Sequence, residues 1–110
     1  MPNRAGDWLN QALRDLEQAR DSKEAGRHEW ACFAAHQAAE KAVEALHLRR
    51  GQEAWGHVVV RLLRELPVDV RTDDALIERA RVLDTFDIPA RCPTIGYAGE
   101  IVEFVRRQMA

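Results

Sequence analysis

The stretch EWACFAAHQAAEKAVEALHLRRG, residues 29–51, constrains the fold of this chain more than any other segment. It is long enough for about six helical turns, and its apolar residues, many of them alanine, leave only a narrow strip of the helix polar. A helix that is apolar nearly all round is surrounded by neighbouring elements rather than laid on a surface. One bundle of 110 residues has little material to enclose such a helix and also to bury Trp8, Trp30 and Trp55. We therefore expect a two-fold symmetric homodimer.

The rest of the chain also has the pattern of helices. Apolar residues recur at three- and four-residue steps, Gly26 and Gly51 are suited to end two helices, and Pro67 stops a third. Thr72 is expected to cap the fourth helix. The pattern predicts an all-α, up-and-down helical bundle in which residues 1–110 form one domain. The five predicted helices cover about residues 4–23, 28–50, 57–66, 72 to near 89, and 98–108.

Composition narrows the class of protein. Hydrophobic residues make up 46% and charged residues 31%, which is typical of a globular chain. The net charge of only -2 excludes a global basic field for nucleic acid, so any such contact must be local. No apolar run is long enough to cross a bilayer and the first residues lack a signal peptide, so we expect a cytoplasmic protein without membrane association. Cys32 and Cys92 are expected to be reduced thiols rather than a disulfide or a metal site.

The polar strip of the 28–50 helix is the first candidate site. It consists of His36, Gln37, Glu40, Lys41, Glu44 and His47. One interpretation is that the strip is the solvated face of an amphipathic helix. The other is that it faces a groove or a second subunit, where its amide, cation, carboxylates and imidazoles converge on a ligand.

The second candidate is the segment DIPARCP, residues 87–93. Pro89 and Pro93 hold the backbone stiff and extended, so Arg91 between them loses little conformational freedom on binding. Arg91 can form a salt bridge to Glu40, Asp84 or Asp87, or it can offer an anion-binding fork to the groove that contains Gln37 and Lys41.

Three blocks together resemble the small prokaryotic HEPN-domain proteins: WLNQALRDLEQA at 8–19, ACFAAHQAAEKAVEAL at 31–46 and LDTFDIPARCP at 83–93. The match covers nearly the whole chain. It falls on these residues: Trp8, Leu9, Cys32, Phe33, Gln37, Glu40, Lys41, Leu83, Asp84, Ile88, Pro89, Arg91 and Pro93. The chain departs from the family pattern at two positions where aromatic residues are common: Phe86 keeps the ring but lacks a hydroxyl, and Cys92 lacks both.

The resemblance implies a helical homodimer, often paired with a minimal nucleotidyltransferase in a system of toxin–antitoxin type, that associates with a nucleotide or RNA. On this basis the expected binding groove contains Gln37, Glu40, Lys41 and Arg91. The expected supporting residues are His36, Glu44, Asp84, Pro89 and Pro93. No cofactor is implied.

An alternative from the same resemblance is a metal-independent ribonuclease with an Arg-x(4–6)-His motif across the dimer, and a third is a purely structural dimeric partner. Arg50 and His57 have the required spacing, but a pair like this is expected by chance in an arginine-rich chain. In the nuclease members the motif lies later, around the fourth helix. Arg50 and His57 are therefore weak catalytic candidates, and we expect no enzyme. No histidine pair has a convincing spacing for a metal site.

Overall fold

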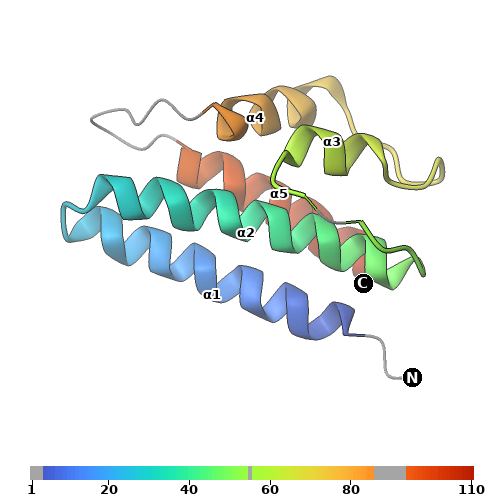
Figure 1. The fold of residues 1–110 in the computed structure, drawn as a ribbon, viewed down its shortest axis with the longest axis horizontal. Helices are drawn as coiled ribbons and strands as arrows, with labels where there is room; N and C mark the ends of the chain where they lie inside the picture. Colours follow the sequence, from blue (N-terminus) through green and yellow to red (C-terminus); the bar gives the residue numbers. More distant parts are fainter. Residues whose placement is uncertain (1–3, 55, 86–93) are drawn as a thin grey trace.

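The computed structural model describes residues 4–54, 56–85 and 94–110, and the regular structure in these ranges is entirely helical (Figure 1). The five helices are α1 (Ala5–Glu24), α2 (His28–Arg49), α3 (Val59–Arg64), α4 (Asp74–Asp84) and α5 (Thr94–Met109). The all-α prediction with about five helices is confirmed. No helix in the described ranges is both long enough and apolar enough to span a membrane.

The ends of α1 and α2 follow from the glycines after them. Gly26 and Gly51 have φ angles of 77° and 75°, which glycine adopts without steric cost. After α1, the amide of Arg27 donates to the carbonyl of Ser22 at 2.8 Å and that of Gly26 to Lys23 at 3.0 Å. After α2, Gln52 donates to His47 at 2.8 Å in the same way. Both ends are Schellman motifs, which satisfy carbonyls that a helix end leaves free.

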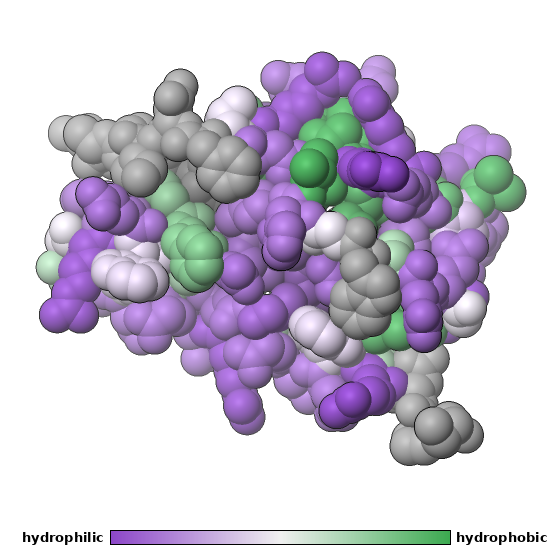
Figure 2. All heavy atoms as spheres, viewed as in Figure 1, coloured by the Kyte–Doolittle hydropathy of each residue, from purple (hydrophilic) through white to green (hydrophobic). Residues whose placement is uncertain are grey.

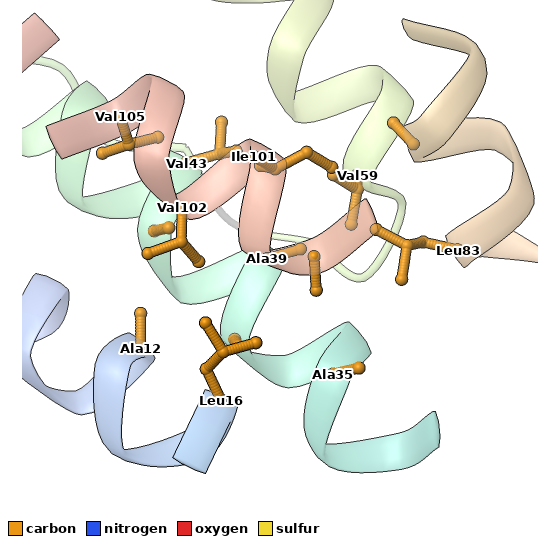
Figure 3. Packing of buried hydrophobic residues seen from close by; sticks show 14 of the residues in the cluster. Ala12, Leu16, Ala35, Ala39, Val43, Val59, Leu83, Ile101, Val102 and Val105 are labelled. Carbon is orange, nitrogen blue, oxygen red and sulfur yellow. The ribbon is translucent and has the colours of Figure 1, made fainter. Parts of the chain in front are cut away.

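Helix α2 lies at the centre of the bundle. It packs along α1 and against α5 on another side, and α3 and α4 cover the remainder (Figure 1). Six of its alanines are completely buried, and because they are small they let the neighbouring backbones approach closely: Ala31, Ala35, Ala38, Ala39, Ala42 and Ala45. Figure 3 shows part of the core, with Leu16 of α1, Val43 of α2 and Val102 of α5 among its buried residues.

The central position of α2 therefore does not by itself require a second subunit. The other four helices enclose it, and among the described residues only its N-terminal end carries large exposed apolar side chains, Trp30 and Phe33. Figure 2 shows that the viewed face of the molecule is mostly hydrophilic, with hydrophobic atoms gathered in a few small areas. The homodimer stays a prediction that must rest on other features.

Several predicted helix limits were wrong in detail, among them the end of α4, which lies at Asp84 and not near residue 89. The side chain of Asp73, not that of Thr72, caps α4 by accepting from the amide of Leu76 at 2.7 Å. Helix α5 begins at Thr94, four residues before the predicted start, and α3 is shorter at both ends than the predicted 57–66 helix. A β-branched or apolar residue near a helix end can be helical or extended, so the exact end of a helix depends on tertiary contacts.

Candidate functional site

The polar strip of α2 is largely buried, so its interpretation as a solvated face is wrong. Glu40 is 5% exposed, Glu44 7% and His47 1%, while His36, Gln37 and Lys41 are half-buried. The strip divides between two sides of the helix. His36, Glu40 and His47 contact residues of the α3–α4 side, whereas Lys41 contacts α1.

Asp84, at the end of α4, joins three helices through one carboxylate. Its Oδ1 lies 3.0 Å from Nε2 of His36 on α2 and accepts from the amide of Val59 at 2.8 Å. Its Oδ2 accepts from the amide of Val60 at 2.9 Å. Val59 and Val60 begin α3, where amides have no partner within the helix. The side chain of Asp84 therefore caps α3 from another helix and ties it to α2.

Glu40 lies between two imidazoles. Its Oε1 is 3.1 Å from Nδ1 of His36 and 3.3 Å from Nδ1 of His57. His57 is 86% exposed, so its ring reaches from the buried carboxylate to solvent. Together His36, Glu40, Glu44, His57 and Asp84 form one group of ionisable side chains, which we call the acid–histidine cluster.

His36 is a cation in this cluster. Burial by itself lowers its pKa, but the hydrogen bonds to Asp84 and Glu40 outweigh burial and raise the pKa to about 9. Burial would raise the pKa of Asp84, yet the bonds from His36 and from the amides of Val60 and Val59 hold it below its usual value. Each ring nitrogen of His36 faces a carboxylate oxygen, so both nitrogens donate and the ring carries its second proton.

Glu44 is different from the other members of the cluster. Burial, followed by the negative charge of Glu40, raises the pKa of Glu44 to about 7, although His57 and Lys41 act in the opposite direction. Within the described residues its side chain makes no hydrogen bond and no ion pair. Buried polar groups normally have such a partner. The carboxyl of Glu44, nearly buried and without a hydrogen bond in the described structure, is therefore a candidate contact for a ligand.

The predicted groove residues do not all share one surface. Lys41 Nζ donates to Oδ2 of Asp15 on α1 at 2.7 Å. Gln37 lines a groove of about 440 Å³ between α1 and α2, whose other lining residues are Asp15, Gln18, Ser22, Arg27, Trp30, Phe33 and Ala34. Glu40 belongs to the acid–histidine cluster instead. Arg91, Pro89 and Pro93 lie outside the described residues.

The weak catalytic candidates are not brought together. Arg50 is ion-paired with Asp69, in the connection between α3 and α4, while the described contact of His57 is with Glu40. In the parts of the chain that the structure covers, Arg50 and His57 do not interact. His47 has a structural role, because its Nε2 lies 2.8 Å from the carbonyl oxygen of Leu62 and so joins α2 to α3.

The sequence did not predict the ion pair between Asp15 and Lys41 or the disulfide bond of Cys32. Asp15 was not identified as the partner of Lys41, although it lies on the side of α1 that carries the buried residues Ala12 and Ala19. Cys32 is disulfide-bonded, so the expectation of a reduced thiol at this position was wrong. The described residues contain no group of three or more His, Cys, Asp and Glu side chains arranged to hold a metal ion.

Comparison with known proteins gives a consistent result. The family model of the HEPN domain matches residues 5–109. The crystal structure of TT1696 from Thermus thermophilus is 42% identical with a TM-score of 0.89, covering 97% of this chain and 99% of that one. An archaeal HEPN homologue, ST0689, is 34% identical with a TM-score of 0.79, over 99% and 100% of the two chains.

A third solved structure is a HEPN domain protein from Thermotoga maritima. It is 33% identical with a TM-score of 0.68, over 94% of this chain and 91% of the other. No curated protein matches the chain. All three structures are thus similar to this chain over nearly its full length.

Proposed function

We propose a function from one established premise, that the chain belongs to the HEPN domain family. The proposal is that it is a nucleotide- or nucleic-acid-associated binding module that works as a homodimer. The observation that carries it is Glu44, a carboxyl on the central helix that is 7% exposed and has no partner among the described residues.

The surroundings of Glu44 suit a ligand with both donor groups and negative charge. An ionised Glu44 can accept from an exocyclic amino group of a base, and a protonated one can donate to a ring nitrogen or carbonyl. Lys41 and His57 both lie close enough to act electrostatically on Glu44. Lys41 has three donors and uses one on Asp15. Its ammonium group and the exposed ring of His57 can therefore face a phosphate. Gln37 in the groove between α1 and α2, Glu40 in the acid–histidine cluster, and Arg91 are the other residues that we propose to take part in binding.

Our proposal for the partner and the setting is supported by the resemblance to HEPN proteins. We propose that the homodimer works beside a minimal nucleotidyltransferase in a two-component system of toxin–antitoxin type, in the cytoplasm. The acidic groups of the cluster do not favour non-specific nucleic-acid binding, which requires several uncompensated cations. Recognition of one nucleotide, or of a modified end, is more consistent with this local charge.

Titration calorimetry with nucleoside mono- and triphosphates and with a short single-stranded RNA tests the proposal. We expect wild-type protein to bind one of these ligands and Glu44→Ala to bind it ten to a hundred times more weakly. A lost hydrogen bond to a charged group is worth roughly 1.5–3 kcal/mol, at about 1.4 kcal/mol per decade.

The matched control is Glu65→Ala, which removes an exposed glutamate that pairs with Arg61 at the end of α3. It should bind like wild type. Equal affinities of Glu44→Ala and wild type would show that Glu44 is not in the site. Absence of binding to every probe would refute the binding module itself.

The ribonuclease alternative is favoured by one contact. Glu40 holds Nδ1 of His57 and leaves Nε2 of the exposed ring available, an arrangement suited to a general base. The ion pair of Arg50 with Asp69 disfavours the Arg50 and His57 combination. We expect no ribonuclease activity that depends on His57. Activity that survives EDTA and disappears in both His57→Ala and Arg50→Ala would make the chain an enzyme.

A further inference from the structure

The N-terminal end of α2 carries an apolar surface that the other described residues leave uncovered. Trp30 is 65% exposed and Phe33 57%. The two rings lie one helical turn apart and contact each other at right angles, with their centroids 6.1 Å apart. The two other large exposed hydrophobic residues of the described ranges, Val58 and Val68, are valines outside α1 and α2. The tryptophan and phenylalanine are thus one local apolar patch.

This patch stands beside a hollow. The rings of Trp30 and Phe33 form part of the wall of the 440 Å³ groove between α1 and α2, and Gln18 and Gln37 line it from the two helices. A protruding aromatic group next to a groove is the shape that an isologous pair requires. If two copies were related by a two-fold axis here, the ring of each copy would enter the groove of the other.

The charge on this surface favours a protein over a nucleic acid. The groove is lined by one arginine, Arg27, and by one carboxylate, Asp15, which Lys41 already neutralises. A single cation on the groove wall cannot supply the several phosphate contacts on which nucleic-acid affinity depends. Aromatic residues and arginine, with few other charges, are the composition of protein interface cores.

We infer that the surface formed by Trp30, Phe33 and the groove beside them is the face through which two copies of this chain pair. The inference rests on the homodimer in the proposed function and adds the location of its interface. Gln37 lines the same groove, so pairing here would place a proposed ligand-binding residue at the edge of the interface.

The area of the patch is compatible with this role. A fully buried aromatic side chain removes about 150–250 Å² from water. With the exposed fractions of Trp30 and Phe33, the four rings of two copies would bury roughly 500 Å². A stable interface buries about 1,600 Å² in total, so the rings supply about a third and the groove walls, with Gln18, Arg27 and Gln37, supply flanking area.

The test compares the oligomeric state of four proteins by light scattering and sedimentation over nanomolar to micromolar concentrations. These are the wild type, Trp30→Ala with Phe33→Ala, Phe33→Asp, and the control Val68→Ala, which truncates a side chain 98% exposed elsewhere. Because the two aromatic side chains are mostly exposed, circular dichroism should show native helicity in every variant. We expect dimers for wild type and control, and at least a hundredfold weaker association for the two aromatic variants. Phe33→Asp would also bring two negative charges together near the two-fold axis, which weakens association further.

Each other result overturns the inference in a distinct way. Dimeric aromatic variants would place the interface elsewhere and leave the proposed homodimer intact. A monomeric wild type at all concentrations would refute both the homodimer and this surface. If a single-stranded RNA probe binds the wild-type monomer and not the Trp30→Ala variant, the surface is a nucleic-acid site instead.

Discussion

Replacing Asp84 with alanine should destabilise the fold through two separable losses. The first is the cap of α3, because the amides of Val59 and Val60 lose the acceptors that lie 2.8 and 2.9 Å away. Loss of a helix cap costs about 1 kcal/mol. The second loss is the partner of His36, whose Nε2 lies 3.0 Å from Asp84.

The second loss is the larger one. Removing one member of a fully buried pair costs about 3–5 kcal/mol. Here the His36 and Asp84 side chains keep 12% and 15% of their exposure, and His36 retains Glu40. We therefore take a cost of about 2 kcal/mol, for a total of about 3 kcal/mol. In a domain of this size, this corresponds to a fall of roughly 10–15 °C in melting temperature.

The assay is thermal and urea unfolding at pH 7 of wild type, Asp84→Ala and Asp69→Ala. Asp69 is the matched control, since it is also an ion-paired aspartate but is 58% exposed, and exposed pairs contribute about 0–1 kcal/mol. Hydrogen exchange at the amides of Val59 and Val60 reports the cap separately. If Asp84→Ala costs no more than Asp69→Ala, the idea that Asp84 holds α3 against α2 is refuted.

The pH dependence gives a second measurement on the same variant. The pKa of His36 is raised in the folded state to about 9 from 6.5. Its contribution to stability is therefore fully present below pH 6.5 and is lost as the pH rises through 9. Wild type should lose stability between these limits, and Asp84→Ala should lose less over the same range.

Three further predictions concern the polar residues of α2 and the proline-bracketed segment. The pKa of Glu44 is raised in the folded state to about 7 from 4.5, so its proton is lost from the unfolded state first and stability falls as the pH rises from 4.5 through 7. Glu44→Gln should therefore melt at a higher temperature than wild type at pH 8, whereas the two should differ little below pH 4.5. Lys41→Ala breaks the ion pair with Asp15, in which both side chains are about a fifth exposed. The free energy of unfolding in urea should fall by about 1 kcal/mol. A fall of more than about 3 kcal/mol would contradict the view that solvent screens this pair. Arg91→Ala should weaken ligand or partner binding ten to a hundredfold with a change of only about 0–1 kcal/mol in stability, and a large fall in melting temperature with unchanged affinity would make Arg91 a structural residue.

Helix positions could be predicted from the sequence because their signals are local. Apolar spacing, Gly26 and Gly51 identify where α1 and α2 lie to within a residue or two. The adjacent residues Thr72 and Asp73 are both good caps, and in the structure the side chain of Asp73 accepts from the amide of Leu76. The local sequence pattern does not decide between these two caps.

The burial of the polar strip could not be predicted, because it depends on contacts between residues far apart in the chain. Asp84 lies 48 residues from His36, and Lys41 lies 26 residues from Asp15. Periodicity places these side chains on a face of a helix but does not say which element covers that face. The family resemblance identified Asp84 as a supporting residue, yet the α3 amides it binds belong to backbone, which carries no sequence signature.

The two glutamates of α2 show how the same local pattern can serve two purposes. Four residues apart on an exposed helix, Glu40 and Glu44 would repel each other by a few tenths of a kcal/mol. In the interior the repulsion is stronger, because the effective dielectric constant is lower than in water. The two carboxylates differ in how this repulsion is offset. Glu40 contacts the imidazoles of His36 and His57. Glu44 has no hydrogen-bond partner in the described structure, and its pKa is raised to about 7. Glu40 is thus used by the fold. Glu44 is left with unused hydrogen-bonding capacity, which is why a ligand, rather than another side chain, is the partner that we propose for it.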